Sequence, residues 1–269
     1  MVLESPVAKQ PIDLRIRALA LFATLLVALP IFALLAKVPW STLVTRILVT
    51  ENSWAIKLSL WSSLIACLMA LLAGVPLAWV LARGNQRITA FLRPIVLSPI
   101  VLPPTVAGIA LLALLGRNGL LGSWIYDATG FALPFTPTAV VIAGIFVSLP
   151  FLVLVTEATF RQLPTELEDQ ARVDGGSEFT IFIHIALPQA RNGIATGALL
   201  AWARALGEFG ATMMFAGSVP GRTLTWPMAV YSAMDTDFED AYALSAFMVL
   251  IAFAVVFLLR NRLMEIFAK

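Results

Sequence analysis

The sequence predicts an all-α integral membrane protein with six transmembrane helices. Of its 269 residues, 60% are hydrophobic and 13% are charged, a balance that suits a helical membrane protein and exceeds what a soluble domain needs. Six long apolar runs divide the chain. The longest charged stretch, residues 164–188, lies between two of these runs, and charge of this density cannot lie in hydrocarbon.

The first predicted span covers about residues 18–36 and follows a polar lead that contains Arg15 and Arg17. A cleaved signal peptide is the alternative interpretation. We expect a retained span, because the run is longer than a usual signal core and no Ala-x-Ala site precedes a polar mature start. After a loop at 37–53, the second span covers about 54–82, and its length implies a tilt or an extension beyond the bilayer.

The third predicted span, about residues 95–115, contains Pro99, Pro103 and Pro104. Prolines this close remove backbone donors and distort a helix. Distorted backbone at membrane depth is tolerated only where protein or a water-filled cavity covers it. Residues 98–108 therefore form either a wall of a translocation path or a kinked helix packed in the bundle. The candidate path residues here are Ser98, Pro103, Pro104 and Thr105.

Three further spans follow, at about residues 138–160, 193–213 and 243–259, and a short interfacial helix is a candidate in the loop at 117–134. In the fifth span, small residues recur every four positions, which predicts a stripe where another helix approaches closely. These residues are Gly193, Gly197, Ala201 and Ala205.

Two charges interrupt the fifth span. Arg204 and Glu208 are four residues apart, so a continuous helix places them on one face. Charges at such depth suggest a functional or cavity-facing role, and a structural ion pair between helices or subunits is the alternative. Arg204 attracts an anionic substrate, whereas Glu208 repels it unless paired and so fits an outer gate or the partner of Arg204. Thr212 adds a neutral hydrogen-bonding group nearby.

Basic residues predict the orientation. With both termini in the cytosol, twelve basic residues fall on the inner side and five on the outer side, which also places residues 164–188 in the cytosol. The inner residues are Lys9, Arg15, Arg17, Arg83, Arg87, Arg93, Arg161, Arg172, Arg191, Arg260, Arg262 and Lys269; the outer ones are Lys37, Arg46, Lys57, Arg117 and Arg222.

The composition disfavours an enzyme with its own metal or nucleotide site. Cys67 and His184 are single residues of their kinds, too few for a cysteine or histidine metal site. No Gly-x-x-x-x-Gly-Lys-Ser/Thr loop is present to hold nucleotide phosphates, so we expect no cofactor in this chain. The acidic run at 235–240 is interpreted as a solvated face, with a docking surface as the alternative.

The charged stretch 164–188 is expected to fold into two short helices. Thr165 followed by Glu168 is typical of a capping box, and Leu167 with Ala171 gives the first helix an apolar face. The second helix presents Phe179, Phe182 and Ile183. Gly175 and Gly176 separate the two helices, and Leu187 and Pro188 are expected to end the unit.

The spacing within this stretch resembles the cytoplasmic loop of permease subunits of ATP-binding-cassette (ABC) importers. That loop reads Glu-Ala-Ala, three residues, Gly, nine residues, then Ile-x-Leu-Pro, and Gly175, Ile185, Leu187 and Pro188 match. The resemblance implies a coupling helix that sits in a groove of the ATPase subunit. The coupling residues that it implies are Glu168, Asp169, Gln170, Ala171, Asp174, Gly175, Phe179, Ile185, Leu187 and Pro188, of which Asp169 and Gln170 depart from the usual Glu and Ala.

A second resemblance concerns the substrate. Residues 203–212, ARALGEFGAT, are similar to the fifth-span signature of oxyanion permeases, and residues 103–108, 214–223, 226–227 and 229–231 resemble the molybdate branch. Sulfate or tungstate permeases are the near alternatives. A stand-alone secondary anion transporter is the alternative of another class, although no repeated half is evident.

The resemblance also implies an assembly and a division of the chain. The implied fold is the bundle of a type I ABC importer permease in the cytoplasmic membrane. The implied partners are a second copy of this chain, two ATPase subunits that bind ATP and Mg, an extracytoplasmic substrate-binding protein and membrane lipid, with no nucleic acid. The implied division is an N-terminal segment at 1–53, a permease core at 54–259 and a tail at 260–269.

Overall fold

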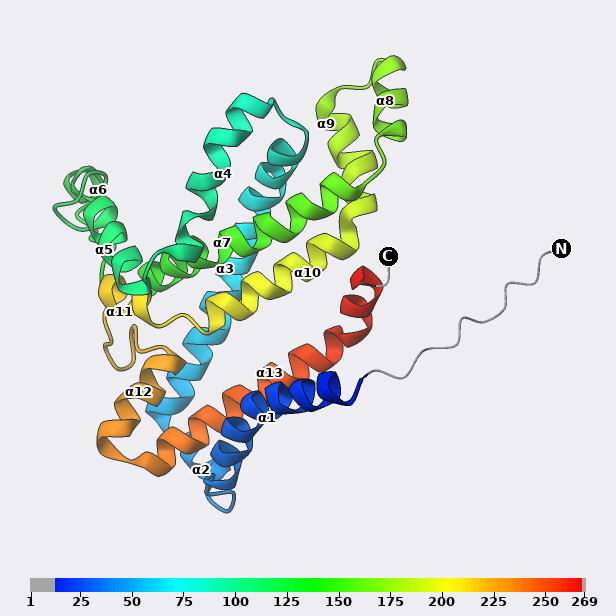
Figure 1. Ribbon diagram of the computed structural model, residues 1–269. Helices are drawn as coiled ribbons and strands as arrows, with labels where there is room; N and C mark the ends of the chain where they lie inside the picture. Colours follow the sequence, from blue (N-terminus) through cyan, green and yellow to red (C-terminus); the bar gives the residue numbers. More distant parts are fainter. Residues whose placement is uncertain (1–12, 268–269) are drawn as a thin grey trace.

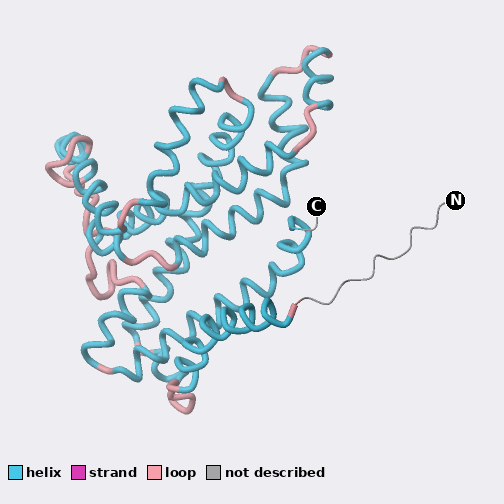
Figure 2. The backbone as a smooth tube through the Cα atoms, in the orientation of Figure 1, coloured by secondary structure: helices cyan, strands magenta, loops and turns pink. Residues whose placement is uncertain are grey.

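The computed structural model describes residues 13–267, with side chains to residue 257, and every element in that range is helical (Figures 1 and 2). Lys9 and Lys269 lie outside the described residues, and the side chains of Arg260 and Arg262 are not described. The elements are α1 (Leu14–Ala36), α2 (Leu43–Leu48), α3 (Thr50–Arg83), α4 (Gln86–Val101), α5 (Pro104–Leu115), α6 (Gly122–Thr129), α7 (Pro137–Gln162), α8 (Glu166–Val173), α9 (Glu178–Ile181), η1 (Phe182–Ala186, a π-helix), α10 (Leu187–Leu206), α11 (Gly210–Ala216), α12 (Trp226–Thr236) and α13 (Phe238–Phe267).

Helices α3, α7 and α10 pack on one another and form the centre of the molecule. Leu81, Leu152 and Phe160 are fully buried there, and the ring of Trp79 meets that of Phe160 edge-on at 5.2 Å. On one side α4 packs on α7, and on the other α13 packs with α1, α2 and α12. Figure 1 shows α8 and α9 at one end of the molecule and α2 and α12 at the opposite end.

The predicted stripe of small residues lies where α10 packs on α7. Gly193, Gly197, Ala201 and Ala205 are all buried. A Cβ atom at Gly193 would lie 2.0 Å from the Thr159 hydroxyl, and one at Gly197 would lie 3.2 Å from Leu152. The absence of side chains at these glycines therefore sets the close approach of the two helices.

Four described helices are long and apolar enough to cross a membrane: α1, α3, α7 and α13. The pair α4 and α5 adds a fifth if it counts as one broken span. Helix α10 is not among them, and it carries the polar Gln189, Arg191, Asn192 and Arg204. The chain is thus a multi-pass membrane protein, but length and composition do not establish the predicted count of six spans.

The predicted third span is two helices rather than one. Helices α4 and α5 meet at 119° around Leu102 and Pro103. Pro104 begins α5 at a position where a missing N–H costs nothing, and Pro103 cannot continue α4. The expected distortion is therefore confirmed as a complete break.

The fifth predicted span, 193–213, also differs from the structure. Its helix α10 ends at Leu206, and α11 begins at Gly210. At the other end, Leu187 and Pro188 do not end the preceding unit, because α9, η1 and α10 follow one another without a gap. The wider π turn, in which the Leu187 N–H binds the Phe182 carbonyl, lets a proline enter a continuing helix.

Other boundaries shift by a few residues. The short helix expected in the loop at 117–134 is α6. Two boundaries of the predicted division of the chain, 53/54 and 259/260, fall inside α3 and α13, and this division stays a prediction.

Candidate functional site

The predicted coupling loop, residues 164–188, folds into α8, α9 and η1. Gly175 adopts a left-handed φ of 85° between α8 and α9, which glycine accommodates without strain. The Ser177 hydroxyl accepts a hydrogen bond from the Thr180 N–H and caps α9. The predicted capping box at the start of α8 is wrong, because the Thr165 side chain makes no capping bond and the Glu168 carboxylate is engaged elsewhere.

Glu168 holds α8 against the end of α3. Its side chain is 1% exposed, and its carboxylate accepts bonds from Nε and a terminal nitrogen of Arg83 at 3.0 and 2.9 Å. Arg83 also donates to the Leu163 carbonyl at 3.1 Å. Glu168 was expected on the side of the loop that faces a partner, but it points inward to Arg83. The charge of Arg83 offsets the cost of burying this carboxylate.

The other residues that were predicted to couple to an ATPase divide into two groups by exposure. Three of these residues are partly buried: Ala171, Ile185 and Leu187. The exposed ones are Asp169, Gln170, Asp174, Gly175, Phe179 and Pro188. The exposed apolar groups near the tip include Phe179 at 74% and Val173, which the sequence did not single out, at 87%. An exposed apolar surface on short helices at the end of a membrane bundle suits contact with another protein.

Arg172 joins the two helices of the coupling loop. It binds Asp169 at 2.8 Å and Glu178 at 2.7 Å. The hydrogen bond from Arg172 lowers the pKa of the Glu178 carboxyl below its ordinary value. The pair is therefore ionised at neutral pH and links α8 to α9 on the exposed surface of the loop.

Arg204 and Glu208 form the expected ion pair, at 2.6 Å, although the helix breaks between them. The Glu208 side chain is 3% exposed, and its second oxygen accepts a hydrogen bond from the Ala211 N–H at 2.7 Å. This carboxylate thereby both neutralises Arg204 and satisfies the first turn of α11. Breaking the helix at Gly207 is what brings the carboxylate to the start of α11.

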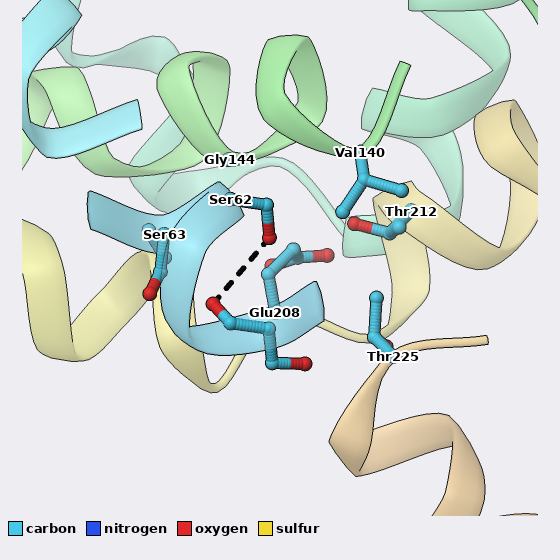
Figure 3. A pocket seen from close by; sticks show the side chains of 9 residues that line it. Ser62, Ser63, Val140, Gly144, Glu208, Thr212 and Thr225 are labelled. Carbon is cyan, nitrogen blue, oxygen red and sulfur yellow. Dashed lines mark hydrogen bonds between the residues drawn. The ribbon is translucent and has the colours of Figure 1, made fainter. Parts of the chain in front are cut away.

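Glu208 and Thr212 line a small buried cavity between α3, α7, α11 and the start of α12 (Figure 3). Its volume of ≈ 10 Å³ is close to that needed for one water molecule. The polar lining also includes Ser59, Ser62, Ser63 and Thr225, and the buried Thr225 hydroxyl has no hydrogen-bond partner among the described residues. The three serines were not predicted as site residues, although three hydroxyls within one apolar span are a signal that could have identified them.

The proline-rich candidates lie beside this cluster rather than in it. Ser98, Pro103, Pro104 and Thr105 are exposed and do not line the cavity. Helix α5 packs directly on α11: a Cβ at Gly210 would lie 2.6 Å from Pro104, and one at Gly108 would lie 2.5 Å from Met214. The start of α5 and the helix that follows Glu208 therefore pack closely against each other at these two glycines.

At the end of the molecule away from α8 and α9, Arg46 of α2 lies among acidic side chains of the run at 235–240. It binds Asp237 at 2.7 Å and also pairs with Glu239 and Asp240. The bond from Arg46 lowers the pKa of Asp237 below its ordinary value. Part of the run predicted as a solvated face thus fastens α2 to the start of α13.

Comparison with known proteins agrees with this architecture. Residues 74–269 match the family described as "Binding-protein-dependent transport system inner membrane component". The chain belongs to this family of membrane transport components. It is 40% identical to the molybdenum transport system permease protein ModB of Mycobacterium tuberculosis, over 88% of this chain and 89% of that protein. With the ModB of Escherichia coli K12 it shares 36% identity, over 79% and 93% of the two chains.

Solved structures show the same fold at low sequence identity. A bacterial ABC transporter involved in the import of alginate gives a TM-score of 0.69 at 18% identity, covering 94% of this chain and 97% of that one. The MetNI methionine ABC transporter gives 0.60 at 14% identity, covering 77% and 94%. The chain thus has the fold of type I ABC importer permeases, as the sequence predicted.

Proposed function

We propose that this chain is the permease subunit of an ATP-driven importer that moves molybdate across the cytoplasmic membrane. The observation that carries the proposal is the 36–40% identity to molybdenum permeases over most of the chain. The exposed coupling loop supports the proposal, because a permease without its own nucleotide site needs a surface that contacts an ATPase subunit.

The proposed assembly contains two copies of this chain, two ATPase subunits and an extracytoplasmic substrate-binding protein. Both termini and the coupling loop face the cytosol in this arrangement, in accord with the distribution of basic residues. ATP and Mg bind to the ATPase subunits. Phe179, Val173 and Asp169 on the exposed side of α8 and α9 are the groups that we assign to the ATPase contact.

Transport proceeds by alternating access. Closure of the ATPase pair displaces α8 and α9, and the Arg83–Glu168 pair passes this displacement to α3. The states differ in how tightly each partner binds, which is the only source of a shift between them. Because Glu208 neutralises Arg204, the pair serves as an outer gate that guides the anion without retaining it.

Reconstitution tests this function. Liposomes that contain this chain, its cognate ATPase and binding protein should accumulate molybdate only with ATP. Replacing both Val173 and Phe179 by Asp should abolish uptake and co-elution with the ATPase, while Val44→Asp, an exposed apolar residue at the opposite end, should leave co-elution intact. ATP-independent uptake would identify a secondary transporter and contradict the proposal. Competition by molybdate, tungstate and sulfate for the binding protein identifies the anion.

A further inference from the structure

A second polar pocket lies where α3 ends, α4 begins and α7 ends. It has a volume of ≈ 280 Å³ and is lined by Gly84 of the α3–α4 turn, by Gln86 and Thr89 of the first turns of α4, and by Arg93 and Arg161. Since α3 and α7 are both long enough to cross a membrane, their ends lie at a membrane surface. The pocket therefore opens at the depth where lipid headgroups lie.

The pocket carries a fixed excess of positive charge. Arg93 and Arg161 share one buried carboxylate, that of Glu157, at 2.5 and 2.8 Å, so two guanidinium groups face one negative charge. Arg161 also donates to the Leu81 carbonyl at 2.7 Å. These bonds hold both side chains in place, yet the side chains remain 37% and 47% exposed. A guanidinium has five N–H donors, so donors remain for a ligand.

The surroundings favour an anion over a cation. The described residues that line the pocket include no Asp or Glu. The first turn of the 16-residue helix α4 lies at the pocket, and its N–H groups add partial positive charge. Two fixed arginines beside a helix start provide the geometry that tetrahedral oxyanions prefer.

An apolar stripe lies on the face of α4 opposite to the pocket-lining Gln86, Thr89 and Arg93, since an α-helix turns about 100° per residue. Ile88, Phe91 and Ile95 are spaced at i, i+3 and i+7 and are 58%, 71% and 54% exposed. These three residues lie on one side of the helix, and a bilayer provides acyl chains to cover such a surface. The stripe faces away from the arginines and therefore does not distinguish a lipid headgroup from a free phosphate, which share the chemistry that the pocket recognises.

We propose that this pocket binds a phosphate group, carried by an anionic phospholipid headgroup or free in solution, between Arg93, Arg161 and the start of α4. The fixed charge excess selects a headgroup of net negative charge, such as phosphatidylglycerol, over a zwitterionic one. A phosphate group in this position lies between the end of α3, the start of α4 and the end of α7. The inference concerns binding alone and does not depend on the transported substrate.

The test is lipid retention by the complete transporter, delipidated in detergent and titrated with phosphatidylglycerol, phosphatidylcholine or inorganic phosphate under native mass spectrometry. Gln86→Glu places a carboxylate in the pocket and, as an acid at a helix start, preserves the fold. Repulsion at about 6 Å in a partly solvated site weakens anion binding about tenfold. Gln189→Glu, exposed near the start of α10, is the matched control for added charge.

A second variant removes the cations without leaving a buried charge unpaired: Arg93→Gln, Glu157→Gln and Arg161→Gln together. We expect phosphatidylglycerol to bind wild type and Gln189→Glu equally, about tenfold more weakly to Gln86→Glu, and not measurably to the triple variant. Equal binding of phosphatidylcholine, or equal effects of Gln86→Glu and Gln189→Glu, would overturn the proposal. Saturation by inorganic phosphate that displaces the lipid would assign the pocket to a soluble anion instead.

Discussion

Replacing Glu168 by Ala removes the buried carboxylate that fixes α8 to the end of α3. The change leaves Arg83, whose side chain is 16% exposed, with the Leu163 carbonyl as its remaining hydrogen-bond partner. Removing one partner of a buried pair costs about 3–5 kcal/mol. Because Arg83 keeps that bond and some access to water, we expect about 3 kcal/mol, assigned to docking of α8 on α3.

This loss of docking free energy raises the population of the state in which α8 is detached from α3. At about 1.4 kcal/mol per tenfold, the detached state of α8 becomes about 100-fold more populated. Hydrogen exchange of the α8 amides, measured by mass spectrometry on the purified transporter, reports this opening directly. Exchange in α8 should accelerate by that factor while exchange in the centre of α7 is unchanged.

Two variants isolate the cause. Glu166→Ala removes an exposed carboxylate from the same helix turn and should change α8 exchange less than threefold. Arg83→Met combined with Glu168→Leu replaces both charges by apolar groups and should restore much of the protection, since such replacement is often neutral. If Glu168→Ala left α8 exchange within threefold of wild type, the ion pair would not anchor the coupling loop.

Three further outcomes are expected. Gly210→Ala should lower the thermal unfolding midpoint of the detergent-purified protein, because overpacking against Pro104 costs about 1–3 kcal/mol of stability. Gly207→Ala, whose added Cβ would have its nearest contact at 3.6 Å, should leave the midpoint unchanged. Because Arg172 lowers the pKa of Glu178, the stabilisation from their pair is fully present above the unfolded pKa of 4.5 and is lost as pH falls through the lower folded pKa. Hydrogen exchange of α9, corrected for intrinsic rates, should therefore be constant from about pH 8 to 5.5. Faster corrected exchange near pH 6.5 would contradict this. Glu208→Gln should cut molybdate uptake at least about tenfold by leaving Arg204 unpaired, and adding Arg204→Gln should recover part of it; equal loss in single and double variants would refute the gate.

Hydropathy predicted the position of most long helices, because the bilayer sets their length. The predicted spans 54–82 and 138–160 lie within α3 and α7, whose observed bounds extend them by only a few residues. Proline chemistry predicted the break after α4. The 119° angle was beyond the sequence, since it depends on how α5 packs against α11 through Gly108.

The structure shows the contacts of the predicted site residues, whereas their roles stay predictions. Spacing suggested the Arg204–Glu208 pair, although the continuous helix assumed for it ends at Leu206. The inward position of Glu168 did not follow from spacing, because its partner Arg83 is 85 positions away in the chain. Ser59, Ser62 and Ser63 were missed because single hydroxyls in a span are common, and only the fold brings them to Glu208 and Thr212.

The π turn η1 has a consequence for direction. Each residue of an α-helix advances the azimuth by about 100°, and a π turn accommodates one residue more than an α turn. Because η1 takes up this extra residue within one turn, deleting Ile183 should convert η1 to ordinary α-helix and leave the azimuth of α9 relative to Arg204 nearly unchanged. Residues 178–206 thus form one continuous helical segment in which η1 accommodates an inserted residue without changing the face that α9 presents.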